Sequence, residues 1–125
     1  MSNTFKDEEK NISKIIDALV EKEDEKALEV LERVGTNCSI DEVRRMTAKA
    51  LVKKNTPESL AIVIGKKGKG INDLSTSVAM STINELLSLE DKENAVKVLS
   101  DVQESAQEEE IRGTAGSVKT LMEYA

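Results

Sequence analysis

The sequence predicts an all-α protein built from repeated helical hairpins, and three observations support this prediction. Aliphatic residues recur at the three- and four-residue spacing of an amphipathic helix in nearly every segment beyond residue 11. Signals that start and stop helices separate these segments. The chain also matches itself when it is shifted by 68 residues, as repeat proteins do.

The spacing of apolar residues in the first half of the chain predicts three helices, over residues 12–20, 27–34 and 43–55. Gly35 is predicted to end the second of them, since glycine is the favoured residue just beyond a helix C-terminus. Ser39 and Glu42 have the spacing of a capping box, which is expected to start the third helix. That helix then runs to about Asn55.

Four more helices are predicted after Asn55. Thr56, Pro57 and Glu58 are typical of an N-cap, a first helical position and an acidic first turn. The apolar run 60–64 follows and ends at Gly65; its length also suits a buried strand, but no second strand is available to pair with it. Apolar spacing then predicts helices over 74–87, 95–106 and 108–122.

An internal repeat accounts for the order of these helices. A gapless shift by 68 residues brings seven identities into line, namely Glu25/Glu93, Ala27/Ala95, Val30/Val98, Leu31/Leu99, Val34/Val102, Glu42/Glu110 and Arg44/Arg112. Any two amphipathic helices share some apolar positions, but this agreement continues through a loop and includes an arginine pair. We therefore predict a right-handed stack of about three helical hairpins behind an N-terminal helix.

The segment Val43-Arg44-Arg45-Met46-Thr47-Ala48-Lys49-Ala50-Leu51 resembles the second helix of a HEAT-type repeat. Residues 111–118 are a weaker version, with Lys119 where the repeat has leucine. The resemblance covers about residues 24–124 and implies a HEAT/ARM-like α-α superhelix. We expect a single domain of residues 9–125 behind a flexible tail at 1–8, because those residues are polar and terminal and have only Phe5 to bury. The resemblance also implies a scaffold that binds a protein partner and has no catalytic residues.

The composition argues against several classes of function. The chain has no histidine and one cysteine, Cys38, which removes His-based catalysis, zinc fingers and intrachain disulfides. We expect no enzyme activity, cofactor or metal. No apolar run approaches the roughly 20 residues of a membrane span, and the polar, acidic residues 1–10 do not resemble a signal peptide. The expected location is therefore cytoplasmic, without membrane contact.

Basic side chains are concentrated in one part of this acidic chain. Residues 44–69 have eight basic side chains and one acidic side chain, whereas the whole chain has a net charge of −6. On a helix, Arg45, Lys49 and Lys53 form one ridge, with Arg44 beside it. The ridge is interpreted either as a solvated face whose lysines pair with acidic neighbours, or as a strip that binds phosphate or an acidic partner.

A glycine loop follows the basic ridge. Its sequence, Ile64-Gly65-Lys66-Lys67-Gly68-Lys69-Gly70-Ile71, resembles the Gly-x-x-Gly core of KH domains, which implies contact with a single nucleic-acid strand. A KH fold also needs strands on both sides of the loop, and neither flank is typical of a strand. Glycines are common in turns for conformational reasons alone. The alternative function is therefore RNA or phosphate binding through residues 44–69.

Overall fold

The computed structural model describes residues 2–22, 24–65, 71 and 75–124, with side chains from Glu8 onward. This part of the chain forms seven α-helices and no strand, which confirms the all-α prediction. The helices are α1 (Ser2–Lys22), α2 (Glu25–Asn37), α3 (Asp41–Lys54), α4 (Pro57–Ile64), α5 (Thr76–Leu87), α6 (Glu93–Ser105) and α7 (Glu109–Tyr124).

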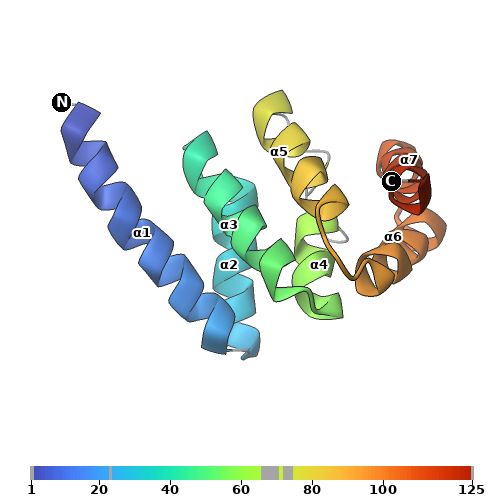
Figure 1. Cartoon of the computed structure of the whole chain (residues 1–125), viewed down its shortest axis with the longest axis horizontal. Helices are drawn as coiled ribbons and strands as arrows, with labels where there is room; N and C mark the ends of the chain where they lie inside the picture. Colours follow the sequence, from blue (N-terminus) through green and yellow to red (C-terminus); the bar gives the residue numbers. More distant parts are fainter. Residues whose placement is uncertain (1, 23, 66–70, 72–74, 125) are drawn as a thin grey trace.

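The helices alternate between two layers (Figure 1). Helices α1, α3, α5 and α7 pack side by side in the first layer, and α2, α4 and α6 form the second layer. Within the first layer, α1, α3 and α5 run in the same direction. Helix α3 lies at the centre and packs against α1, α2, α4 and α5. The right-handed stacking of the layers stays a prediction.

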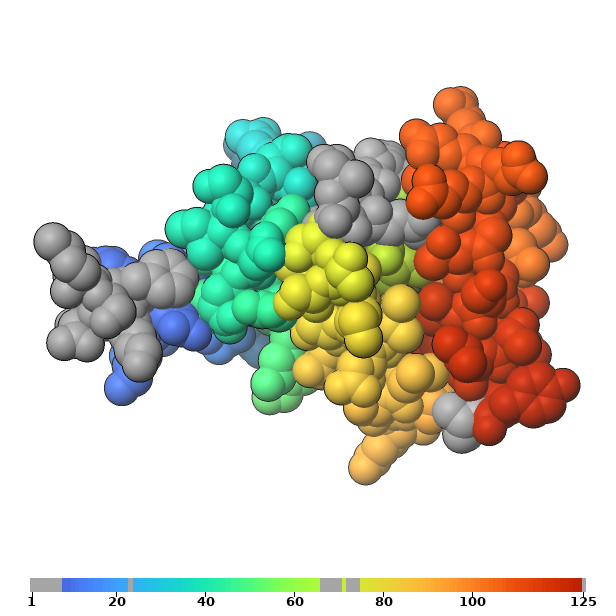
Figure 2. Space-filling view, turned by 90° about the horizontal axis from the view of Figure 1, so that it is seen from above, coloured from blue at the N-terminus to red at the C-terminus, as the bar shows by residue number. Residues whose placement is uncertain are grey.

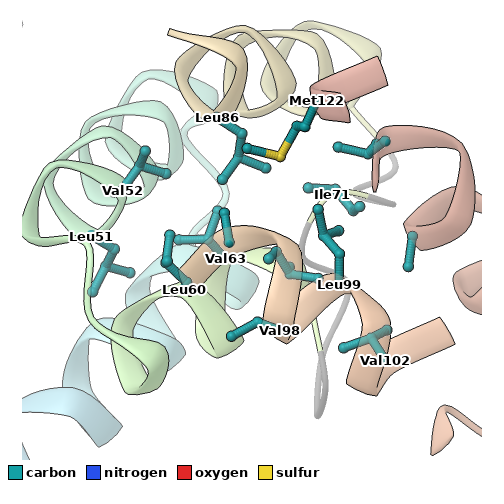
Figure 3. Close-up of a cluster of buried hydrophobic side chains, with 14 of the residues drawn as sticks. Leu51, Val52, Leu60, Val63, Ile71, Leu86, Val98, Leu99, Val102 and Met122 are labelled. Atoms are coloured by element: carbon teal, nitrogen blue, oxygen red, sulfur yellow. The ribbon is translucent and has the colours of Figure 1, made fainter. Parts of the chain in front are cut away.

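One aliphatic cluster extends from α1 to α7 between the layers. Its most deeply buried members, each less than 2% exposed, include Leu31, Leu51, Leu60, Ile64, Leu86 and Leu99. Ile71, from the connection between α4 and α5, is also buried and lies beside Leu99 (Figure 3). Because the core is aliphatic, its stability depends on close packing of branched side chains.

Helix α4 begins and ends as the sequence predicts. Thr56 is its N-cap and Pro57 its first residue, and the partner of Thr56 in the capping box is Ser59. Gly65 ends the helix with φ 96° and ψ 38°, a left-handed conformation that glycine adopts without strain. The run 60–64 is therefore helical.

Two predicted helix boundaries are wrong. Gly35 lies inside α2, which continues to Asn37, and Ile40 is the N-cap of α3 without any capping side chain. The expected capping box of Ser39 and Glu42 is therefore not formed; Glu42 instead pairs with Arg45. Gly35 has a packing role, because a Cβ there would lie 3.3 Å from Cγ2 of buried Thr47 on α3.

Other boundaries differ less from the predictions. Helix α1 begins at Ser2, so it includes most of the segment predicted to be a flexible tail; the order of that segment in solution stays a prediction. Helix α5 begins at Thr76 behind the N-cap Ser75, later than the predicted start at Leu74, which lies outside the described residues. Helices α6 and α7 closely match their predicted ranges.

The 68-residue shift also relates the helix boundaries. Helices α2 and α6 both have 13 residues, and they begin at Glu25 and Glu93. Helices α3 and α7 begin at Asp41 and Glu109. Corresponding positions therefore carry the same local structure. Membership of the HEAT class stays a prediction.

Two helical glycines allow a test of the role of Gly35. We expect Gly113→Ala to raise the free energy of unfolding by up to about 1 kcal/mol, because alanine favours a helix and no atom lies within 4 Å of the new methyl group. Gly35→Ala should bring no such gain, because its methyl group crowds Thr47. Urea unfolding of both variants measures the difference. Equal stabilisation by the two changes would contradict the close approach of α2 to α3.

Candidate nucleic-acid or protein interface on helix α3

The predicted basic residues on α3 occupy a helix that is covered on most sides. Four neighbouring helices pack against α3, and within it only Lys49 and Lys53 are exposed. Neither lysine forms an ion pair or hydrogen bond with a described residue. Two of the four predicted cations on α3 are thus directed to solvent, and the other two are held within the fold.

Arg44 belongs to the contacts that join the starts of α3 and α5. Its guanidinium forms an ion pair with Asp41, and its side chain is only 12% exposed. Ser75, the N-cap of α5, donates a hydrogen bond of 2.8 Å to the other carboxylate oxygen of Asp41. The hydrogen bond from Ser75, followed by the one from Arg44, lowers the pKa of Asp41 below its ordinary value.

Arg45 is also paired. Its Nη2 lies 2.6 Å from Oε2 of Glu42, and its Nε lies 3.2 Å from the same oxygen. A further guanidinium hydrogen bond reaches the hydroxyl of Ser77 on α5. The charges of Arg44 and Arg45 are therefore offset by acids in the first turn of α3, whereas Lys49 and Lys53, whose pairing the solvated-face interpretation expected, have no partner among the described residues.

These contacts fix how α3 and α5 align. At the other end of α3, Asn55 donates to the carbonyl of Asp91 at 3.1 Å, and Asn94 donates to the carbonyl of Asn55 at 3.0 Å. The two helices are thus parallel and joined at their starts (Figure 1). The end of α3 is joined instead to the α5–α6 connection and to α6. Figure 2 looks onto the end at which both helices begin, where α3 and α5 lie next to each other.

The alignment brings an apolar side chain to the level of the exposed lysines. Arg45 meets Ser77, and one helical turn further along each helix are Lys49 on α3 and Met80 on α5. Met80 is 66% exposed, a high value for a large apolar residue. Exposed Asn84 follows it at about the level of Lys53. We call Lys49, Lys53, Met80 and Asn84 the α3/α5 face.

The glycine loop is described only at its two ends. Gly65 is buried, and its N–H donates to the carbonyl of Ala61 at 3.0 Å, so this amide is engaged in ending α4. Ile71 is part of the core. Lys66, Lys67, Gly68 and Lys69 lie outside the described residues, and their contribution to a site stays a prediction.

Sequence reasoning missed Met80 and the acidic partners of the arginines. In the sequence, an apolar residue on the exposed side of a helix cannot be distinguished from an apolar residue in the core. Only the structure reveals its exposure. The spacing Asp41–Arg44 and Glu42–Arg45, three residues in each case, was the available signal for pairing.

A narrow cavity lies between α2, α3, α4 and α5, next to the α3 start. It is lined by Gly35, Thr47, Thr82 and neighbouring residues, and it has room for about one water molecule. Thr47 and Thr82 direct their hydroxyls to carbonyls of their own helices, Val43 and Val78. The cavity is far smaller than a site for a metabolite or cofactor.

Comparison with known protein families, with curated proteins and with solved structures gave no match for this chain. Among the helices described, none combines the length and the apolar composition needed to cross a membrane. The HEAT and KH resemblances therefore stand on the residues quoted for them alone.

The contacts of Asp41 predict a pH-dependent effect on stability. A carboxyl group whose pKa is lowered by folding binds protons more readily in the unfolded chain than in the folded protein. Its contribution to the stability of the fold is therefore present above the unfolded-state pKa and is lost as the pH falls through the folded-state pKa. We expect Asp41→Asn to lower the melting temperature at neutral pH, and the difference from the native protein to shrink on acidification. Thermal unfolding between neutral and strongly acidic pH, with exposed Glu29→Gln as control, measures this. An unchanged melting temperature at neutral pH would contradict it.

Proposed function

We propose that the protein is a non-enzymatic scaffold that binds a protein partner through the α3/α5 face. The observation that supports this most is the combination of two exposed lysines without described partners and an exposed methionine at the same level of the neighbouring helix. Protein interfaces use apolar anchors of this kind, rimmed by charged groups. The contacts between the starts of α3 and α5, and those that join the end of α3 to the α5–α6 connection, fix the alignment of the face, which reduces the ordering cost of binding.

The same geometry favours protein over nucleic acid as the partner. A phosphate backbone that approached the start of α3 would meet the carboxylates of Asp41 and Glu42, which offset Arg44 and Arg45. Stacking of bases needs aromatic side chains, and the chain has only Phe5 and Tyr124. Tyr124 lies at the end of α7, which is not part of the α3/α5 face.

Affinity capture from a nuclease-treated native extract tests the proposal. Three bait proteins are compared: the native chain, the charge-reversed variant Lys49→Glu/Lys53→Glu, and a control variant. The control, Lys26→Glu/Lys97→Glu, makes the same change of charge at exposed residues of α2 and α6. We expect the native chain and the control to retain the same protein and the α3 variant to lose it. Retention by all three proteins would contradict binding at this face.

RNA or phosphate binding stays the alternative, supported by the high positive charge of residues 44–69. If it occurs, affinity comes mainly from phosphate electrostatics and should fall by about 0.7 log units per log unit of salt for each phosphate neutralised on a single strand. Titration of labelled single-stranded RNA against the native protein and Lys66→Glu/Lys67→Glu measures this. We expect the double variant to lose binding at unchanged helicity. If the native protein binds no RNA at low salt, protein binding is the one proposal that remains.

A further inference from the structure

We infer that the partner segment is an acidic amphipathic helix, with carboxylates one helical turn apart beside an apolar side chain. This inference rests on the proposed function and specifies the chemistry that the α3/α5 face would recognise. It follows from three properties of the face: its charge, the spacing of its lysines and the position of Met80.

The exposed surface of α3 beyond its first turn is basic, whereas the carboxylates of Asp41 and Glu42 in the first turn are paired with Arg44 and Arg45. Lys49 and Lys53 are its exposed residues, and no described acid pairs with them. Acids are abundant elsewhere in the chain, which has 24 acidic and 18 basic side chains. The two ammonium groups thus remain open to carboxylates of another molecule, and complementary charge attracts such a segment before contact.

The spacing of the lysines matches a helix in the partner. Residues four apart on a helix lie about 6 Å from each other along the axis. Carboxylates at the same spacing on a partner helix can meet Lys49 and Lys53 together, with the apolar side chains of that helix one position to the side. The two charge pairs then align the partner helix along α3.

Met80 supplies the apolar part of recognition. It is exposed on α5 at about the level of Lys49, so a partner helix that binds along α3 and reaches across to α5 can cover the methionine with an apolar side chain. A flexible thioether adapts to leucine, isoleucine or methionine alike, and such residues are frequent at surfaces that bind helices. An acidic segment without an apolar residue would leave this side chain uncovered.

Arg45 limits the length of the recognised segment. Its guanidinium is engaged with Glu42 and Ser77, so its charge is already offset and adds little attraction for an acidic helix at the start of α3. The Asn55–Asp91 contact closes the other end. The face between these contacts spans about two helical turns, which suits a short helix with two carboxylates facing α3.

Synthetic helical peptides provide the probe. The first peptide has on the order of 20 residues, with glutamates four residues apart and leucines next to them. The second peptide has glutamine in place of each glutamate, and the third has serine in place of each leucine. Fluorescence anisotropy measures their affinity for the full chain. We expect the first peptide to bind about tenfold more tightly than either of the others, and salt to weaken it. Isotope-labelled protein should show amide shifts in α3 and α5.

Variants of the protein complete the test. The affinity for the first peptide should fall by at least about tenfold in Lys49→Glu/Lys53→Glu and by less in Lys49→Gln/Lys53→Gln. It should be unchanged in the control variant Lys26→Glu/Lys97→Glu. Circular dichroism verifies that each variant is folded. No binding of the acidic peptide, equal binding of the glutamine peptide, or equal binding to all variants would overturn the inference. The proposed function would survive those results if captured protein still depends on Lys49 and Lys53.

Discussion

Replacing Ile71 by alanine is expected to lower the free energy of unfolding by about 2–5 kcal/mol. Ile71 is 2% exposed and lies beside Leu99 in the core, although it comes from the connection between α4 and α5 (Figure 3). Truncation removes apolar burial and leaves a cavity that the surrounding helices fill only in part. This loss is a large share of the 5–15 kcal/mol that typically stabilises a domain.

Urea unfolding followed by circular dichroism measures this effect. Ile71→Val, which removes one methylene, should cost only about 0.5–1.5 kcal/mol. Met80→Ala provides an exposed control, expected within about 0.5 kcal/mol of the native protein. If Ile71→Ala cost no more than Met80→Ala, the connection would not anchor the core, and the packing of Ile71 beside Leu99 of α6 would be wrong.

Leu31→Ala and Leu99→Ala are expected to have similarly large effects, about 2–5 kcal/mol each. The two leucines have no measurable exposure, and they occupy the same position of α2 and α6 under the 68-residue shift. Each is surrounded by aliphatic side chains, so both substitutions remove the same group from similar packing.

The comparison of these two variants tests the repeat as a physical unit. If corresponding helices play corresponding roles, the two losses measured by urea unfolding should agree within a factor of about two. Exposed Val30→Ala serves as the control in α2 and should cost much less. A cost below about 1 kcal/mol for one leucine and several kcal/mol for the other would contradict equivalent packing of α2 and α6.

Much of the fold could be predicted because the aliphatic pattern is repetitive. Buried residues such as Leu31, Val43 and Leu99 follow the helical period, and this period alone specifies which side of each helix is covered. Pro57 and Gly65 restrict the backbone so strongly that the ends of α4 follow from residue type. The seven helices and the absence of strands from the described residues result from these local rules.

The errors arose where a tertiary contact or a competing local contact overrides the expected preference. Glycine at position 35 has the appearance of a helix stop, yet it lies inside α2, where a Cβ would crowd the methyl group of Thr47. Ser39 and Glu42 have capping-box spacing, but Glu42 forms its ion pair with Arg45. Local sequence cannot specify which of two partners a carboxylate selects when both lie within reach.

The candidate site was only partly predictable. The positive charge of residues 44–69 identified α3, but charge counts do not reveal that Arg44 and Arg45 are engaged with acids of their own helix. Met80 could not be assigned to the surface, because its exposure depends on how α5 packs against α3 and α7. Side-chain pairing and exposure, rather than residue type, thus define the α3/α5 face.

Site-specific photo-crosslinking tests the central claim, that the α3/α5 face binds a protein. A photoreactive amino acid replaces Met80 in one protein and Lys97, exposed on α6 in the other layer, in a second. After irradiation in native extract, we expect position 80 to yield a discrete adduct that nuclease leaves intact and protease destroys, and position 97 to yield none. Adducts of equal yield from both positions, or an adduct at position 80 that nuclease removes, would contradict the proposed protein-binding face.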